Sequence, residues 1–146
     1  MRELADGDRI RRFLRALGRG ADREGACYLT GGATAVLRGW RASTIDVDIL
    51  LTPETETLLR AIQRLKEELQ VNVKLASPAD FIPVPADWEG RSIFEATEGR
   101  LTVYHFDPYA QALAKLERGH TQDLGDVEAM IQRGLIVPGR PAGLLR

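Results

Sequence analysis

The amino-acid sequence predicts an α+β fold in which helices flank a mixed β-sheet and two further helices follow toward the C-terminal end. Short apolar or alternating runs bounded by glycine have the pattern of strands. Longer segments repeat apolar residues at helical spacing. The resulting order is helix, strand, helix, strand, helix, strand, hairpin, helix, helix. A chain of 146 residues, 44% hydrophobic and 28% charged, has the size and composition of one globular domain, which we expect to span residues 1–146.

Local patterns assign most of the first half of the chain. Apolar residues near helical spacing predict a helix over residues 4–17, within an N-terminal region that precedes the first strand. An apolar run bounded by glycines predicts a strand at 26–30, and after a Gly-Gly pair residues 33–37 resemble the first turns of a helix. A Thr-Pro-Glu start predicts a helix over 52–70, and alternation indicates a strand at 71–75.

The segment Ile45–Leu51 alternates carboxylate and aliphatic side chains, which is the period-two pattern of a strand. Asp46 and Asp48 are therefore predicted on one face, and the aliphatic residues on the other. Because aliphatic residues flank both acids, we expect a central strand in place of a solvated edge strand. The aliphatic residues that share a face are Ile45, Val47 and Ile49.

The second half begins with a proline-containing segment, residues 77–91, which we expect to be an irregular connection. A hairpin follows, with strands at 93–96 and 101–106 that turn at a Glu-Gly pair. Two helices are then predicted, the first over residues 108–118 and the second from Thr121 or Asp123 to about Gly134. We expect residues 136–146 to form a flexible tail.

Charge, cysteine content and hydropathy exclude several classes of protein. A net charge of −1 does not fit a protein that coats nucleic acid, although a local basic patch remains compatible with it. The single cysteine, Cys27, allows no intrachain disulfide and lies in an apolar run, where we expect it to be buried. No segment has the pattern of a secretory signal or a membrane span. We therefore expect a cytoplasmic protein with no membrane partner.

The most informative segment joins a glycine turn to a pair of carboxylates. Gly31 and Gly32 end a strand and begin a helix, and glycines let a phosphate approach the backbone N–H groups. Asp46 and Asp48 then present two like charges on one strand face, which repel unless a cation lies between them. Carboxylate oxygens suit Mg²⁺. A phosphate-binding turn beside metal-binding acids predicts phosphoryl or nucleotidyl transfer.

Each half of this pattern has a structural explanation when it stands alone. A Gly-Gly pair is usually only a turn, and Asp-x-Asp is common on exposed strand faces. The two together, in this order and a short helix apart, are much more specific for a function.

The segment resembles the first motif of the polymerase-β-like nucleotidyltransferase superfamily, in which a Gly-Gly or Gly-Ser turn precedes a strand with Asp-x-Asp. It is most similar to the AbiEii-type branch, which includes bacterial toxin nucleotidyltransferases and many small uncharacterised proteins. The resemblance implies a nucleotidyltransferase-like sheet, two metal ions, or one together with the nucleotide, on the catalytic residues Asp46 and Asp48, and Mg²⁺, or Mn²⁺ in its place, as cofactor. The residues that carry it are Gly31, Gly32, Ala33, Ala35, Arg41, Ser43, Thr44, Asp46 and Asp48.

A second stretch, residues 109–127, is similar to the helical Lys-Leu…Arg…Arg-Asp-x-x-Asp signature of that branch. The resemblance makes Lys115 a ligand of the triphosphate and Asp123 a carboxylate of the site. Lys115 is equally compatible with a solvated helix lysine, and Asp123 with the N-cap of the last helix. Asp126 fits an acid in the first helical turn, where the helix dipole favours it.

Two further residues of the first motif belong to the implied nucleotide site. With Gly31 and Gly32, the resemblance places Arg41 and Thr44 at the nucleotide. Arg41 is open to two interpretations, because its guanidinium could contact a phosphate or form an ion pair with Asp46 or Asp48.

The sequence departs from the family pattern at three positions. Gly32 stands where the superfamily often has a serine whose hydroxyl touches phosphate. The strand at 71–75 has no third carboxylate to act as general base, and Asp80 is the nearest substitute, with Asp87 more remote. Gln122 stands where the branch often has arginine. These departures bear on catalytic competence more than on the fold.

The sequence therefore predicts an Mg²⁺-dependent nucleotidyltransferase that moves a nucleoside monophosphate from an NTP onto a hydroxyl acceptor. Asp80, or a metal-bound hydroxyl, is expected to act as base. The acceptor is an RNA end, a protein side chain or a small molecule, and a toxin–antitoxin role with a cognate partner protein fits the resemblance. The alternatives are a degenerate member that binds a nucleotide or a partner protein without turnover, and a protein-interaction domain that keeps only the fold.

Overall fold

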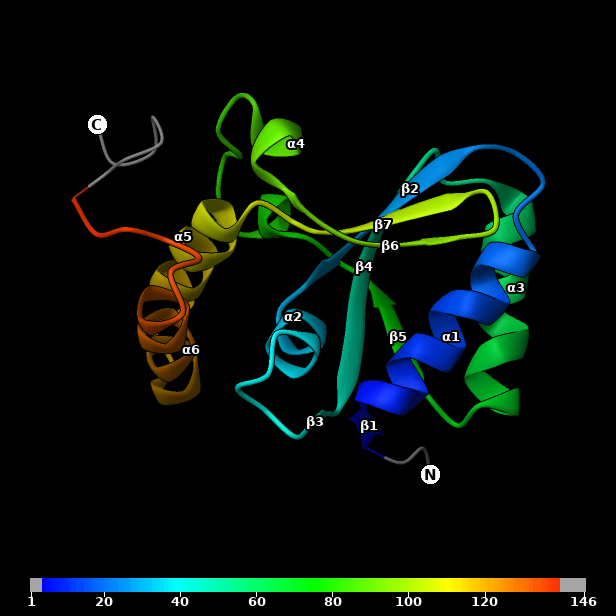
Figure 1. Cartoon of the computed structure of the whole chain (residues 1–146), viewed down its shortest axis with the longest axis horizontal. Helices are drawn as coiled ribbons and strands as arrows, with labels where there is room; N and C mark the ends of the chain where they lie inside the picture. The colour runs from blue at the N-terminus through cyan, green and yellow to red at the C-terminus, as the bar shows by residue number, and fades with distance from the viewer. Residues whose placement is uncertain (1–3, 140–146) are drawn as a thin grey trace.

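The computed structural model describes residues 4–139, which contain a five-stranded mixed sheet with helices on both sides (Figure 1). The expected tail at 136–146 lies outside the described residues from position 140 onward, and its first residue, Ile136, packs in a buried cluster with Ala112 and Met130. In sheet order the strands are β5 (Asn72–Leu75), β4 (Asp46–Thr52), β2 (Gly25–Thr30), β7 (Leu101–His105) and β6 (Ile93–Glu98).

The pairing of the strands confirms the predicted mixed sheet. β2 lies at the centre and pairs antiparallel with β4 and parallel with β7. β4 pairs parallel with β5, and β6 and β7 form the expected antiparallel hairpin. The α+β class, the order of the elements and the central position of the strand that carries the two acids are therefore as predicted.

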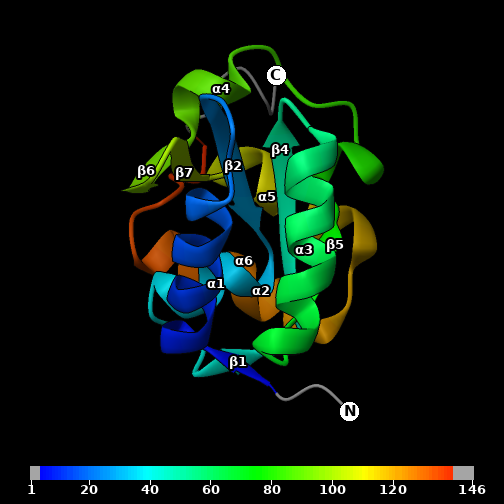
Figure 2. The same cartoon turned by 90° about the vertical axis from the view of Figure 1, so that its right-hand side faces the viewer.

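Helices cover the two faces of the sheet in separate groups. In Figure 2, α1 (Gly7–Arg19) and α3 (Glu56–Glu68) lie in front of the strands, whereas α5 (Pro108–Arg118) and α6 (Thr121–Gln132) lie behind them. The main core fills the space under α1 and α3, because their apolar stripes face the buried aliphatic residues of β2, β4 and β7. None of the helices within residues 4–139 has the length and apolar character of a membrane-spanning segment.

The first helix begins later than predicted. The Asp6 side chain accepts a hydrogen bond from the Arg9 N–H (2.9 Å), so Asp6 is the N-cap and α1 starts at Gly7. Leu4, the first apolar residue of the predicted helix, is 59% exposed and lies outside α1. Residues 5–6 form β1 (Ala5–Asp6), which pairs antiparallel with β3 (Ser43–Thr44). Two-residue strands have too little pattern to be predicted.

The start of α3 also differs from its predicted position at residue 52, and the other boundaries differ by less. α2 (Gly32–Leu37) and β4 start close to their predicted positions, and α3 begins at Glu56 because the Thr55 hydroxyl accepts a hydrogen bond from the Leu58 N–H (3.2 Å). The connection at 77–91 is mainly irregular, as expected, but it contains a 3₁₀ turn (Pro78–Asp80) and the short helix α4 (Trp88–Arg91).

Candidate active site

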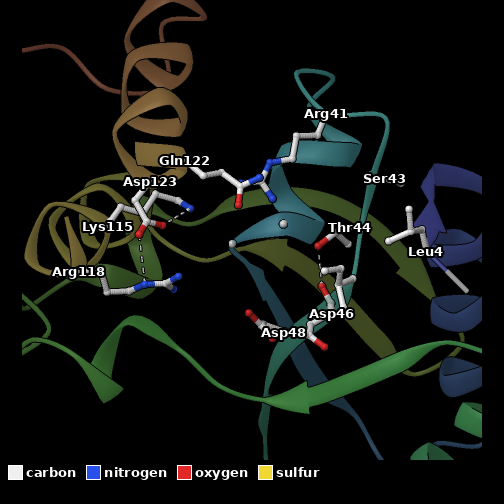
Figure 3. A pocket seen from close by; sticks show the side chains of 13 residues that line it. Leu4, Arg41, Ser43, Thr44, Asp46, Asp48, Lys115, Arg118, Gln122 and Asp123 are labelled. Carbon is white, nitrogen blue, oxygen red and sulfur yellow. Dashed lines mark hydrogen bonds and ion pairs between the residues drawn. The ribbon is translucent and has the colours of Figure 1, made fainter. Parts of the chain in front are cut away.

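A hollow of about 250 Å³ opens where the end of β2, the start of β4 and the two C-terminal helices meet. Figure 3 shows the two acids of β4 on one side of it, and Lys115, Arg118 and Asp123 on the other side. Residues from the two matched motifs therefore line one cavity although they lie about 70 positions apart in the chain. The lining residues are Leu4, Gly31, Gly32, Arg41, Ser43, Thr44, Ile45, Asp46, Asp48, Lys115, Arg118, Gln122 and Asp123.

The glycine bend, Gly31–Gly32, has a conformation and a packing that require glycine. Gly31 has a φ of +61°, which side chains disfavour, and a Cβ there would lie 3.3 Å from the Asp48 carboxylate. A Cβ on Gly32 would lie 2.0 Å from the Thr44 hydroxyl oxygen. Thr44 therefore occupies the space that a serine at position 32 would need, which explains physically why this chain has glycine there.

The two acids lie on the same face of β4, as predicted. Val47, Ile49 and Leu51 point into the core, while Asp46 and Asp48 alternate with them on the face of the hollow. Asp48 is directly opposite Thr30, the residue before the glycine bend. One part of the prediction is wrong, because Ile45 precedes the strand and is 69% exposed instead of sharing the buried face.

The two carboxylates have different surroundings. Asp46 accepts a hydrogen bond from the Asn72 amide and forms an ion pair with the Lys74 ammonium (3.2 Å). Among the described residues, Asp48 has no hydrogen bond or ion pair of this kind. Burial and the nearby Asp46 charge raise the pKa of Asp48, and the charges of Lys74, Arg118 and Lys115 partly offset this rise. A ligand cation would relieve the repulsion between the two acids.

The opposite wall is a buried charge cluster built by α5 and α6. The Lys115 ammonium donates to the Asp126 carboxylate (2.9 Å) and lies 3.9 Å from Asp123. Arg118 forms an ion pair with Asp123 (3.4 Å between Nε and Oδ2). Lys115 is 6% exposed, so the alternative prediction of a solvated lysine on the helix surface is wrong.

Arg41 does not pair with Asp46 or Asp48. Its guanidinium donates to Asp126, which also accepts from the Trp40 indole N–H (3.0 Å). Asp126 is 3% exposed, accepts from three donors and lies beyond the first turn of α6, so the interpretation of a first-turn acid favoured by the helix dipole is wrong. This contact fastens α6 to the segment between α2 and β4.

Asp123 is not a helix cap, since the N-cap position of α6 is His120. Asp123 lies inside the first turn, is 4% exposed and lines the hollow. Its Oδ2 atom has no hydrogen-bond partner among the described residues, although Arg118 lies within ion-pair distance. A buried carboxylate oxygen in this state can accept a hydrogen bond from a ligand.

Asp80 lies outside the hollow. Its carboxylate accepts a hydrogen bond from the Ser77 N–H (3.0 Å) and caps the 3₁₀ turn, where the side chain is exposed. Asp87 also does not line the hollow, so the structure brings neither of the two candidate bases to the acids of β4. The third carboxylate that lines the hollow is Asp123, from α6.

Two polar residues at the site were not expected from the sequence. Asn72 contacts Asp46, and Gln111 accepts a hydrogen bond from the Gly31 N–H (3.0 Å). Gln111 could have been found, because it lies four positions before Lys115 on the same predicted helix and therefore on the same face. Asn72 gives no such signal without knowledge of the strand pairing that places it beside Asp46.

The donor set of the hollow fits Mg²⁺ only together with a phosphate. Among residues 4–139, no group of three or more His, Cys, Asp or Glu side chains is arranged to hold a metal ion. Mg²⁺ usually keeps several waters and takes one or two carboxylates plus substrate phosphates. Asp46 and Asp48 can provide the carboxylates. Cys27 is no ligand or nucleophile here, because burial raises the pKa of its thiol to about 12.

Comparison with known proteins agrees with this arrangement. A family model described as a nucleotidyltransferase of unknown function (DUF6036) matches residues 8–136, which include both walls of the hollow. Neither the curated proteins nor the solved structures give a match. The family match covers far more than half of the chain, and this protein therefore belongs to the DUF6036 family of nucleotidyltransferases of unknown function.

Proposed function

We propose that this protein is an Mg²⁺-dependent nucleotidyltransferase that moves a nucleoside monophosphate from an NTP to a hydroxyl group. The observation that carries the proposal is that Asp46 and Asp48 line the same hollow as the glycine bend, with cationic side chains on the opposite wall. The acids suit a divalent cation, and the bend and cations suit a polyphosphate. The family description supports the reaction class.

In the proposed reaction the acceptor hydroxyl attacks the α-phosphorus of the NTP. A bond forms between the acceptor oxygen and that phosphorus, the bond to the bridging oxygen breaks, and pyrophosphate leaves. Mg²⁺, or Mn²⁺ in its place, would be held by Asp46 and Asp48 and would stabilise the negative charge that develops on the phosphate oxygens.

The other residues of the hollow have roles in binding and proton transfer. Lys115 and Arg118 neutralise the triphosphate, and Gly31, Gly32, Thr44 and Arg41 shape its binding site. We assign the hydroxyl proton to Asp123, because it is the third carboxylate that lines the hollow and its buried Oδ2 atom has no hydrogen-bond partner among the described residues, whereas Asp80 is exposed and occupied by its own turn.

Several finer features stay predictions. The nucleotide is open, and the acceptor remains an RNA end, a protein side chain or a small molecule. The AbiEii-type branch, a toxin–antitoxin role with a cognate partner protein and a cytoplasmic location also rest on the sequence alone.

The proposal is tested by incubating the protein with each α-labelled NTP, Mg²⁺ and three acceptors: total RNA, the protein itself and glycerol. We expect label transfer from at least one NTP, loss of that transfer in Asp48→Asn, and near wild-type transfer in Asp80→Asn. The second variant is a matched control, because Asp80 does not line the hollow. No transfer, together with no NTP binding at millimolar nucleotide, would contradict the proposal.

A second candidate function is nucleotide binding without turnover. The absence of a carboxylate on β5 favours it, since no acid stands beside Asp46 and Asp48 on the neighbouring strand. Calorimetry that shows Mg²⁺-NTP binding without nucleotide consumption would support this candidate over the enzyme. A partner profile that is unchanged after replacement of both acids by alanine would instead indicate an interaction domain.

A further inference from the structure

Four buried or half-buried polar side chains form a continuous relay that ends at the glycine bend. The relay begins at Glu95 on β6, passes through His105 on β7 and Thr34 on α2, and ends at Gln111 on α5. His105, Thr34 and Gln111 are each 2% exposed or less. Only Gln111 among the four lines a hollow near the acids, so most of the relay lies behind the site.

The direction of the hydrogen bonds at the two ends of the relay follows from the chemistry of the partners. A hydrogen bond from His105 lowers the pKa of Glu95, so its carboxylate is ionised and must accept from His105 Nε2 (2.8 Å). His105 Nδ1 is hydrogen-bonded to the Thr34 hydroxyl (3.0 Å), which also donates to the Leu29 carbonyl (3.3 Å). The Thr34 oxygen accepts from the Gln111 amide nitrogen (3.2 Å).

Gln111 is fixed in one orientation by a backbone partner on each of its two polar atoms. Its Nε2 also donates to the Phe106 carbonyl (2.8 Å), so Oε1 is the atom that faces the glycine bend and accepts from the Gly31 N–H (3.0 Å). Gly31 has a φ of +61°, a conformation that glycine leaves readily unless its surroundings hold it. Gln111 is thus the side chain that holds it, and the same helix carries Lys115 one turn later on the same face.

From this geometry we infer that Gln111, kept in register by Thr34 and His105, is the positioning residue of the glycine bend for the polyphosphate. The inference rests on the proposed nucleotide site and names residues for which no role has been assigned. Because Gln111 and Lys115 both lie on α5, the relay aligns the glycine bend and Lys115 with each other. The orientation of Gly31 therefore depends on a side chain, Thr34, that cannot touch a ligand in the hollow.

The test compares Kd values for an NTP and for its monophosphate, by calorimetry with Mg²⁺. We expect Gln111→Met and Thr34→Val to weaken NTP binding about tenfold and monophosphate binding less than twofold, because only the polyphosphate needs the bend and Lys115 aligned. Thr34→Ser restores the hydroxyl and should stay within twofold of wild type.

The matched controls are Gln132→Met and Thr57→Val, which each remove one exposed side-chain hydrogen bond. If the inner variants fail to fold, the same Kd values are measured for Glu95→Gln, which lies at the half-buried outer end of the relay.

Amide hydrogen exchange of the nucleotide-free protein tests the structural half separately. We expect the Gly31 amide to exchange at least tenfold faster in Gln111→Met than in wild type or Gln132→Met. An unchanged Gly31 amide, NTP binding within twofold of wild type, or equal weakening of NTP and monophosphate would each overturn the inference. Failure of the wild-type protein to bind any NTP would instead overturn the proposed function, and the exchange rates would then decide this inference alone.

Discussion

At the scale of single residues, Asp48 combines proposed catalytic use with a cost to stability. Burial and the neighbouring Asp46 charge raise the pKa of Asp48, so its ionised form is less favourable in the folded chain than in the unfolded chain. The contribution of Asp48 to stability is therefore fully present when it is protonated, and it is lost as the pH rises through the raised pKa. The ionised Asp48 carboxylate is thus held beside Asp46 although burial and the like charge disfavour it.

Replacement of Asp48 by asparagine should consequently stabilise the protein at pH 7 while it removes transfer activity. A relief of about 1 kcal/mol corresponds to a rise in Tm of about 2–4 °C for a chain of this size. The gain should vanish near pH 3, where aspartate is protonated in both states, and thermal melts at the two pH values measure it. Asp46→Asn is the control, because it loses the ion pair with Lys74 and should gain less. A lower Tm for Asp48→Asn at pH 7 would show that Asp48 is not strained.

The positions at the candidate site that the sequence predicted are those that depend on local pattern. Period-two alternation was enough to place Asp46 and Asp48 on one face of a strand. The partner of Arg41 was missed, because Asp126 lies 85 positions away and local patterns carry no information on such contacts. Asp80 is close to the end of β5 along the chain, but the 3₁₀ turn directs its carboxylate to the Ser77 N–H.

At the scale of elements, one buried carboxylate of α6 connects this helix to two other segments. Asp126 accepts from Trp40, Arg41 and Lys115, and it thus joins α6 to α5 and to the segment after α2. A buried carboxylate with several cationic donors is costly to remove, since the cations then stay buried without a partner.

Asp126→Asn should therefore destabilise the protein by about 3–5 kcal/mol, which is the range for loss of one member of a buried ion pair. Chemical denaturation measures this change in the free energy of unfolding. Glu128→Gln lies on the same helix, is exposed, and should change the free energy by less than about 0.5 kcal/mol. Equal stability of the two variants would mean that the cluster does not hold α6 in place.

A second contact between elements joins the end of α1 to the turn of the β6–β7 hairpin. A Cβ on Gly18 would lie 2.1 Å from the Glu98 carbonyl oxygen, whereas the nearest atom to a Cβ on Gly20 would be 3.5 Å away. We expect Gly18→Ala to destabilise the protein by about 1–3 kcal/mol through overpacking, and Gly20→Ala to be close to neutral. Denaturation midpoints of the pair test this, and a neutral Gly18→Ala would show that α1 can move away from the hairpin.

Prediction of the elements succeeded where patterns were long. All five strands of the sheet and the helices α1, α2, α3, α5 and α6 were expected, because alternation and helical spacing extend over enough residues to be distinct. β1 and β3 are two residues each, and their pairing joins segments on either side of β2. The start of α1 was misplaced since Leu4 fits the apolar spacing, although Asp6 caps the helix after it.

At the scale of the whole molecule, the site is formed by two walls that come from different parts of the chain. The acids Asp46 and Asp48 belong to the sheet, and Lys115 and Arg118 belong to α5 on the other side of the hollow (Figure 3). Both cations are already paired with carboxylates of α6, and the two acids of β4 alone do not complete a metal site, so Mg²⁺ and the nucleotide are each expected to need the other. Mg²⁺ and NTP should therefore stabilise the fold cooperatively.

Thermal melts with Mg²⁺ alone, NTP alone and both together test this expectation. Ligand at one hundred times its Kd stabilises a fold by about 2.7 kcal/mol, and we expect a shift of that order only when both are present. Asp48→Asn should abolish most of the shift. A shift with Mg²⁺ alone as large as that with Mg²⁺-NTP would contradict the expectation, because it would require a complete metal site in the protein.

The separation of the two walls along the chain has a consequence for biosynthesis. The strand with Asp46 and Asp48 emerges from the ribosome long before Lys115, Arg118 and Asp126, which must all dock before the hollow exists. A growing polypeptide thus lacks the proposed nucleotide site, and we expect any transfer activity to begin only once translation has passed α6.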